Sequence, residues 1–299
     1  MMSRTGFRRF CREIKETKMV FRYLGTAAAE GIPAYFCGCD NCKKARLIGG
    51  RAVRSRPQAI VDGRLLIDFG ADTLTHIQRF GIDSTNIRSC VITHAHSDHF
   101  YPVDLEMILP GFANPPEGWR LDFFGSKEVR ERAVTERGPQ TLERLTKLGR
   151  VTFTEVKAYE PFRTQNYTIT PLTGLHDPKA GPLIYIISDG DKTILYAHDT
   201  HFFPDEVWDF LAEMKPRFDM VSLDCCNALT PLDYIGHMSL TENIEVRRRF
   251  LAEGFADEKT RFIANHFSHN GKCSVYDDFL KPANDGGFEV SYDGMIVEL

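Results

Sequence analysis

The sequence predicts an α/β protein in which β-sheets are covered by helices. Three observations support this prediction. Short apolar strands alternate with helical stretches along the chain, hairpins are mixed with strand–helix–strand steps, and His or Asp residues directly follow several of the strands. Because hairpins make antiparallel pairs and helical crossovers join parallel strands, the mixture favours sheets that are flanked by helices.

In the first half of the chain, strands and hairpins come before the helices. Segment 20–26 (VFRYLGT) predicts a strand, and segment 59–70 (AIVDGRLLIDFG) a hairpin with its turn at Asp62–Gly63. Segments 89–95 and 121–126 predict two further strands, the second followed by helices from about residues 127 and 140. The Pro- and Gly-rich segment 110–119 (PGFANPPEGW) predicts an irregular loop, and both a lid and a mere connector fit it.

The second half continues in the same way. Segments 151–156 and 167–176 predict strands, and segment 182–200 predicts a hairpin with its turn at 189–191. Helices are expected over 204–214 and over 239–254, where Ser239 and Gly254 supply start and stop signals. Strands are expected over 218–225 and 261–269, and segment 287–299 predicts a closing hairpin that turns at Asp293–Gly294.

Composition sets limits on the function. The chain has 299 residues, is 42% hydrophobic and carries a formal net charge of −4, so it can bury a full core and shows no sign of nonspecific nucleic-acid binding. Residues 1–18 are the exception, with six Arg or Lys against two Glu. We interpret them as a solvated basic extension, and residues 19–299 as a single domain.

Localisation is predicted from what the sequence lacks. No apolar run approaches the roughly 18 residues that span a bilayer, and no apolar segment follows the basic extension as in a secretory signal. We therefore expect a cytoplasmic protein without a membrane partner. In that reducing compartment, clustered cysteines suggest a metal site rather than disulfides.

The stretch VITHAHSDHF (91–100) places three histidines and an aspartate within six positions. On a strand His94 and His96 share one face, while Asp98 and His99 can turn towards a second point nearby. The pattern predicts two neighbouring metal ions. Further ligands are expected where other strands end, at His176, Asp199 and His266.

Three other histidines are less specific. His198 and His201 flank Asp199, and we interpret them as loop histidines, although either could orient a ligand. His76, in a helix-like segment, is expected to be packed or exposed rather than a ligand.

The order H-x-H-x-D-H, then His, Asp and His, resembles the metallo-β-lactamase superfamily of metal-dependent hydrolases. The resemblance runs from about Val20 to Leu299 and implies a four-layer αββα sandwich, with two mixed β-sheets flanked by helices. It implies that one metal is held by His94, His96 and His176. It implies that the second is held by Asp98, His99 and His266, with Asp199 bridging both.

A second cluster lies in YFCGCDNCKKA, where Cys37, Cys39 and Cys42 are close enough to bind one Zn²⁺. Structural zinc takes four ligands, and His269 is the candidate for the fourth; free or redox-active thiols are the alternative. The surrounding segment resembles the PhnP-type cyclic phosphodiesterase subfamily. That resemblance implies a structural zinc on three such cysteines and a histidine.

The predicted chemistry is hydrolysis. Two divalent metals, Zn²⁺, Mn²⁺ or Fe, can share a bridging water and lower its pKa to about 7, and the hydroxide then attacks a phosphodiester. Asp98 can both act as a metal ligand and orient this hydroxide. His237 resembles the histidine that contacts phosphate in phosphodiesterase members of the superfamily, and the helix start after it could offer N–H groups to an anion. A helix-cap neighbour without a catalytic role is the alternative.

We therefore expect a phosphodiesterase that opens a small cyclic phosphate such as 5-phosphoribosyl 1,2-cyclic phosphate. The alternatives are a nuclease of the tRNA 3′-processing type, a lactonase or thioesterase, and a non-catalytic accessory protein similar to the B protein of pyrroloquinoline quinone biosynthesis. The expected partner is a small phosphate ester rather than nucleic acid, and a homodimer is left open.

Overall fold

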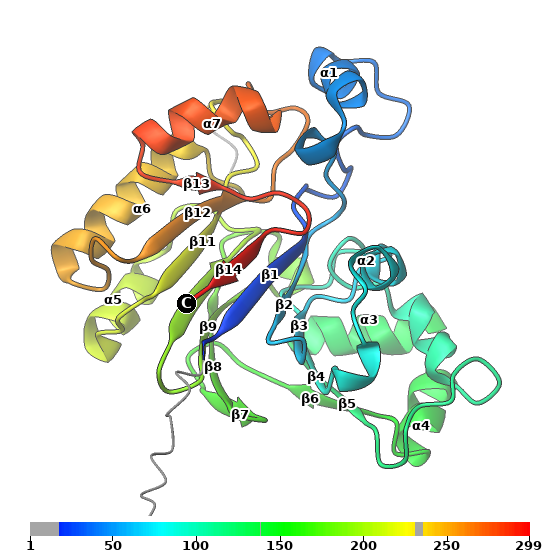
Figure 1. Ribbon diagram of the computed structural model, residues 1–299. Helices are drawn as coiled ribbons and strands as arrows, with labels where there is room; N and C mark the ends of the chain where they lie inside the picture. The colour runs from blue at the N-terminus through cyan, green and yellow to red at the C-terminus, as the bar shows by residue number, and fades with distance from the viewer. Residues whose placement is uncertain (1–17, 138, 231–235) are drawn as a thin grey trace, which may run out of the picture.

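Two seven-stranded mixed sheets face each other in the computed structural model, which describes residues 18–137, 139–230 and 236–299. Helices cover both outer faces, so the molecule is a four-layer αββα sandwich, as Figure 1 shows. The α/β prediction and the four-layer arrangement are confirmed. Apart from Lys18, the basic extension predicted over residues 1–18 lies outside the described residues.

The first sheet has the order β14-β1-β2-β3-β4-β5-β6. Strands β3 to β6 are parallel, and β14, β1, β2 and β3 pair antiparallel. The bounds are β1 Val20–Gly25, β2 Gln58–Val61, β3 Leu65–Ile67, β4 Ser89–Val91, β5 Leu121–Gly125, β6 Val151–Glu155 and β14 Ile296–Glu298. The predicted turn between β2 and β3 has both central residues in the left-handed region, with φ of 50° at Asp62 and 67° at Gly63, as a type I′ turn requires.

The second sheet has the order β13-β12-β11-β10-β9-β8-β7. Strands β7 to β10 form antiparallel hairpins, and β10 to β13 are parallel. The bounds are β7 Phe162–Thr164, β8 Tyr167–Thr173, β9 Leu183–Ser188, β10 Thr193–Ala197, β11 Met220–Asp224, β12 Arg261–Asn265 and β13 Glu289–Val290.

The closing hairpin predicted at Asp293–Gly294 is wrong. Strand β13 pairs with β12 in the second sheet, whereas β14 pairs with β1 in the first, so the chain crosses from one sheet to the other at this turn. The cause is the buried carboxylate of Asp293, which accepts hydrogen bonds from Thr26 Oγ1 and Ser55 N, both at 2.7 Å. These contacts tie the turn to loops of the first sheet and bring β14 to the open edge of β1.

The helices divide between the two outer layers. Helices α2, α3 and α4 pack on the first sheet, α5, α6 and α7 on the second, and α1 lies in a projecting loop (Figure 1). The bounds are α1 Asp40–Ile48, α2 Thr73–Phe80, α3 Lys127–Arg137, α4 Pro139–Lys147, α5 Asp205–Met214, α6 Leu240–Glu253 and α7 Tyr276–Asp285. Helices α1 and α7 were not predicted, because α1 overlaps the cysteine cluster and α7 contains Pro282.

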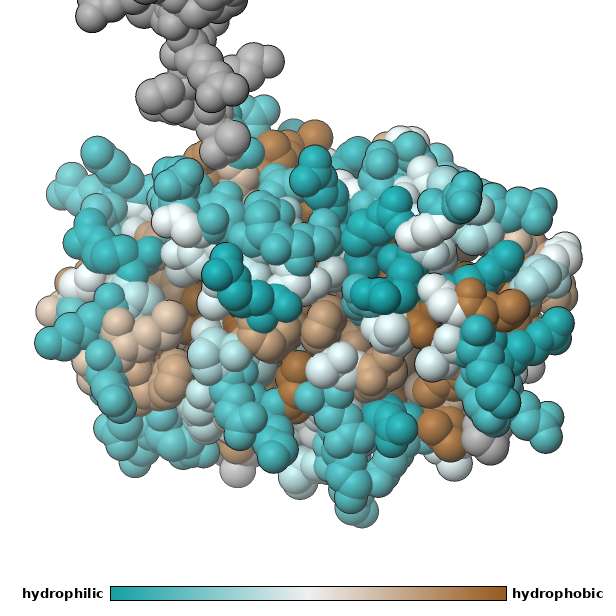
Figure 2. Space-filling model, turned by 90° about the horizontal axis from the view of Figure 1, so that it is seen from below, coloured by the Kyte–Doolittle hydropathy of each residue, from teal (hydrophilic) through white to brown (hydrophobic). Residues whose placement is uncertain are grey.

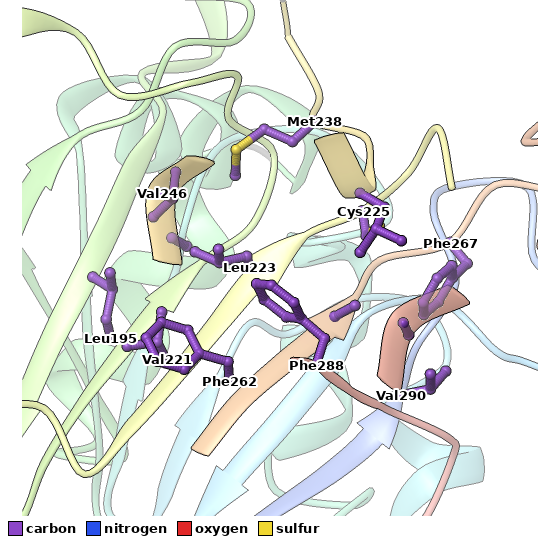
Figure 3. Close-up of a cluster of buried hydrophobic side chains, with 14 of the residues drawn as sticks. Leu195, Val221, Leu223, Cys225, Met238, Val246, Phe262, Phe267, Phe288 and Val290 are labelled. Carbon is purple, nitrogen blue, oxygen red and sulfur yellow. The ribbon is translucent and has the colours of Figure 1, made fainter. Parts of the chain in front are cut away.

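Apolar side chains fill each interface between layers. Aromatic residues such as Phe21, Tyr185 and Tyr196 lie between the two sheets. Figure 3 shows the layer outside the second sheet, where Val221 and Leu223 of β11 pack near Val246 of α6. On the face seen in Figure 2, hydrophilic residues predominate and hydrophobic ones form small separate patches. Within the part of the chain that the structure describes, no helix is long and apolar enough to span a bilayer.

Candidate metal centre

The candidate ligands meet at one edge of the sandwich because each follows the carboxyl end of a strand. His94 to His99 follow β4, His176 follows β8, Asp199 follows β10 and His266 follows β12. In sheets with parallel strands, such ends gather the loops that form binding sites. All seven residues come together there, as their positions at strand ends led us to expect.

Three histidines form the first group. His94, His96 and His176 each offer one ring nitrogen, and these nitrogens lie within 4.8 Å of one another. His96 Nδ1 is 3.3 Å from His176 Nε2. This spacing suits three nitrogen ligands around one ion, because each would stand about 2 Å from the metal.

The second group is built around the carboxylate of Asp199. Asp199 Oδ2 lies 2.9 Å from His99 Nε2 and 3.2 Å from His266 Nε2, and Oδ1 lies 3.7 Å from His176 Nε2. Asp98 Oδ2 lies 3.2 Å from His99 Nε2. Asp199 therefore stands between the first group and the residues expected to hold a second ion.

Buried atoms without hydrogen bonds show that the residues fit divalent cations. Among the described residues, His94 Nε2, His99 Nε2 and Asp199 Oδ2 are buried and have no hydrogen-bond partner. His99 Nε2 and Asp199 Oδ2 are only 2.9 Å apart, yet their geometry is not that of a hydrogen bond. Leaving such atoms unpaired is costly, and metal ions would satisfy them together.

The pKa values of the candidate histidines without metal also indicate a cation site. Burial lowers the pKa of His94 well below its usual value, which leaves the ring neutral with a lone pair to donate. Burial also opposes protonation of His99, but the surrounding carboxylates, first that of Asp199, raise its pKa well above the usual value. The carboxylates around His99 thus carry enough negative charge to bind a cation. When metal is absent, a proton on His99 balances part of that charge.

A polar group holds the second ring nitrogen of each histidine that follows β4 and β8. His99 Nδ1 donates to Asp68 Oδ2 at 2.7 Å, His94 Nδ1 lies 3.1 Å from Thr93 Oγ1, and His176 Nδ1 donates to Gly236 O at 3.1 Å. His96 Nε2 lies 3.4 Å from Asp177 Oδ2. When the rings are neutral, as metal binding requires, these partners favour the tautomers that turn the lone pair of the inward nitrogen towards the centre.

The sequence reasoning missed Asp68 and Asp177. Asp68 is fully buried just beyond β3, and its Oδ1 accepts from Thr93 N at 2.8 Å and Thr93 Oγ1 at 2.9 Å. Its position after a strand was the same signal that pointed to His176 and Asp199. Asp177 adjoins His176 but had no pattern of its own.

Three of the residues at the centre have left-handed backbone conformations. The φ angles are 70° at Asp68, 51° at Asp199 and 64° at His266. For non-glycine residues such conformations cost about 1–3 kcal/mol each and cluster at functional sites. The fold therefore maintains strained backbone at the points where two candidate ligands and one supporting carboxylate face inwards.

Asp224, the last residue of β11, links His237 to the centre. Its Oδ2 accepts from His237 Nδ1 at 2.8 Å and from Asp199 N at 2.9 Å, and its Oδ1 accepts from Cys226 N and Met238 N. Asp224, Asp199, His237 and His266 could themselves hold an ion. With both oxygens already engaged, however, Asp224 is better placed to position His237 than to bind metal.

His237 lies beside the candidate ligands, with its ring centroid 5.0 Å from that of His176 and 5.5 Å from that of His266. Burial would lower its pKa, but the Asp224 carboxylate outweighs burial and raises the pKa of His237 to about 9. The expectation of free N–H groups at the following helix is not supported. Ser239 and Glu242 form a capping box there, and the Glu242 carboxylate occupies the helix start.

The less specific histidines lie outside the ligand groups. His198 is buried, with Nε2 2.8 Å from Ser222 Oγ, and its ring centroid is 6.1 Å from that of His266. His201 is half-buried, and its backbone N–H donates to Leu175 O, which joins the segments of Asp199 and His176. His76 is packed, bonded to Ser55 Oγ and Gln58 Oε1 at 2.7 Å each.

The cysteine cluster forms a separate site. Cys37, Cys39, Cys42 and His269 each offer a ligand atom within 4.8 Å of the others, and His269 Nδ1 is 3.5 Å from Cys37 Sγ and 3.4 Å from Cys39 Sγ. Three sulfurs and one nitrogen suit tetrahedral zinc. Since His269 follows His266 by three residues, an ion here would tie the α1 loop to the end of β12.

Comparison with known sequences identifies one family. A family model described as "Beta-lactamase superfamily domain" matches residues 63–255, about two thirds of the chain. A search of curated proteins found no match.

Comparison with solved structures agrees with the fold. A diphosphatase described as new in the PhnP family has a TM-score of 0.71 at 20% identity, over 94% of this chain and 97% of that one. Zn²⁺-bound PqqB from Methylobacterium extorquens has a TM-score of 0.69 at 17% identity, over 94% and 100%. The short form of human tRNase Z has a TM-score of 0.57 at 15% identity, over 93% and 98%. At these identities the similarity demonstrates the fold alone.

Proposed function

The chain belongs to the β-lactamase superfamily, and from this premise we propose that it is a di-metal hydrolase that opens small cyclic phosphodiesters. The fold implies divalent metal binding, and the His and Asp groups described above supply the ligands. The observation that carries the proposal is the convergence of buried, unpaired ligand atoms on one centre with His237 at its side.

The residues divide into two sets. His94, His96 and His176 would hold one ion; Asp98, His99 and His266 would hold the other, with Asp199 between them. When bound, two divalent cations acidify a water molecule and offset the negative charge that grows on the phosphate in the transition state. Burial would raise the pKa of Asp98, but the neighbouring His99 and His94 together outweigh burial and lower it. Its carboxylate therefore stays ionised, ready to bind and orient.

His237 supports a phosphate ester over an uncharged substrate. Asp224 holds its Nδ1, and with a raised pKa the ring is protonated at neutral pH. An imidazolium there can donate a hydrogen bond to a phosphate oxygen or a proton to the leaving alkoxide. A lactone or thioester carries no phosphate charge for it to bind.

A substrate panel tests this proposal. Metal-loaded protein should hydrolyse bis(p-nitrophenyl) phosphate and small cyclic phosphodiesters, and Asp98→Ala should abolish that activity. Asp83→Ala, which removes an exposed carboxylate from the turn before β4, should not affect it. Activity on lactones or thioesters alone would disprove the phosphodiesterase proposal.

A further inference from the structure

The three residues that follow β3 support the loop that carries Asp98 and His99. Asp68 Oδ2 accepts from His99 Nδ1 at 2.7 Å, and Phe69 N donates to His99 O at 2.8 Å. A Cβ atom on Gly70 would stand 2.1 Å from Asp98 O, so only glycine fits at that position. The position of these three residues therefore determines where two of the candidate ligands lie.

The carbonyl oxygen of Asp68 needs a hydrogen-bond donor at the point where the regular pairing of β3 with β2 ends. Ala59 opposite Ile67 is the last pair in that register, and Asp68, the next residue, has a left-handed φ of 70°. The side chain of Gln58, at the start of β2, supplies the donor: its Nε2 donates to Asp68 O at 2.9 Å. Gln58 is buried, so water does not compete for this carbonyl oxygen.

The same amide group also holds the carbonyl oxygen of Gly70, through one hydroxyl group. Gln58 Nε2 donates to Thr73 Oγ1 at 2.8 Å, and Thr73 Oγ1 donates to Gly70 O at 2.6 Å. Thr73 is the first residue of α2 and is buried. Both ends of the segment 68–70 are thus connected to Gln58.

The available protons determine which way the Gln58 amide points. Asp68 O can only accept, and Thr73 gives its hydroxyl proton to Gly70 O, so both groups present acceptors to Gln58. The NH₂ group must therefore face them, which places Oε1 2.7 Å from His76 Nδ1. The amide has a hydrogen-bond partner on each side and a single orientation that satisfies all of them.

We propose that Gln58 is a positioning residue for the metal centre, because it holds Asp68 in the left-handed conformation from which the Asp68 carboxylate reaches His99. Such a conformation is strained for an aspartate. Rotation of Asp68 into the extended region would turn its carbonyl oxygen away from Gln58, so the hydrogen bond opposes this rotation. The inference rests on the proposed metal centre, but it does not depend on which substrate is hydrolysed.

The test is the affinity for Mn²⁺, measured by electron paramagnetic resonance of the free ion. Gln58→Met removes the amide and keeps the length of the side chain. It should weaken Mn²⁺ binding about 10-fold, the lower end of the range for loss of a partner of a metal ligand. Thr73→Val keeps the shape of the side chain, should weaken binding by a smaller factor, and serves if circular dichroism shows that Gln58→Met is unfolded. Wild-type affinity in the folded variants would overturn the proposal.

A double variant distinguishes positioning from a general loss of stability. If Gln58 acts through Asp68, Gln58→Met should weaken Mn²⁺ binding much less in an Asp68→Asn background than in the wild type. Equal factors in the two backgrounds would mean that the two residues act independently, and would contradict the proposal.

Ser89→Ala is the matched control. Ser89 is buried at the start of β4, the end away from the candidate ligands, and its Oγ lies 2.5 Å from Thr164 Oγ1. This variant also loses a buried hydrogen bond of the first sheet, so it should unfold more easily yet bind Mn²⁺ as tightly as the wild type. Weakening equal to that of Gln58→Met would show that affinity follows stability, and would overturn the proposal. The substrate panel decides the hydrolase proposal separately, because Mn²⁺ affinity is measured without substrate.

Discussion

Replacing Asp68 with Asn tests whether this buried carboxylate prepares His99 to bind metal. In the wild type, Asp68 Oδ2 accepts from His99 Nδ1 at 2.7 Å, so a neutral His99 ring keeps its proton on Nδ1 and turns the lone pair of Nε2 towards Asp199. An Asn with its oxygen towards Thr93 would present an NH₂ group to His99 Nδ1. His99 could then keep that contact only with its proton on Nε2, the nitrogen needed for metal.

The opposite orientation of the amide is no better. Its NH₂ group would face Thr93 N, a donor that lies 2.8 Å from Asp68 Oδ1 in the wild type. With metal on His99 Nε2, either orientation therefore loses one buried hydrogen bond, which costs about 1–3 kcal/mol. Loss of such a supporting partner typically weakens metal binding about 10- to 100-fold, and we expect that decrease for Asp68→Asn.

Mn²⁺ titration, followed by electron paramagnetic resonance of the free ion, measures this affinity. Imidazole and carboxylate ligands accept Mn²⁺, whereas thiolates favour Zn²⁺, so the cysteine cluster should contribute little signal. The control is Asp219→Asn: Asp219 accepts from Lys192 Nζ and Thr193 N, both at 2.9 Å, at the opposite end of β11. If Asp68→Asn binds Mn²⁺ as tightly as wild type and control, the tautomer argument is refuted.

Three further substitutions test other parts of the structure. His237→Ala should lower phosphodiester turnover about 10²- to 10⁴-fold, as loss of an acid–base group does, with metal content unchanged by mass spectrometry; unaltered turnover would return His237 to a capping role. Cys39→Ser should lose one zinc and some thermal stability but keep Mn²⁺ binding, and an unchanged zinc content would rule out the structural site. Burial lowers the pKa of His76 from 6.5 to about 4, so the unfolded chain binds more protons between these pH values. The contribution of a neutral His76 to the free energy of unfolding is therefore fully present above pH 6.5. It decreases as the pH falls towards 4, by about 3 kcal/mol in total. In urea unfolding, His76→Gln should lose this part of the pH dependence, and equal slopes in both proteins would contradict it.

The sequence predicted the fold, and it predicted that the candidate ligands lie together, where the determining contacts leave a local pattern. Asp62–Gly63 gave a hairpin because both residues accept left-handed backbone, and the H-x-H-x-D-H stretch has its ligands within six positions. His176, Asp199 and His266 could be found because each follows an apolar strand. None of these signals needed knowledge of which strands become neighbours.

Long-range contacts explain what the sequence did not predict. Asp293–Gly294 has the same local signal as Asp62–Gly63, but Asp293 bonds to Thr26 and Ser55, and the two flanking strands join different sheets. The role of Asp68 depends on which ring nitrogen of His99 it meets. A single Asp after a predicted strand does not indicate this contact, because the contact depends on which strands become neighbours in the folded sheet.

The central claim is that one cluster of His and Asp side chains holds two metal ions. Anomalous diffraction from crystals soaked in Mn²⁺ or Zn²⁺ tests it most directly. We predict two peaks separated by Asp199, one among His94, His96 and His176 and the other among Asp98, His99 and His266. A single peak at this cluster, or none with saturating metal, would contradict the account.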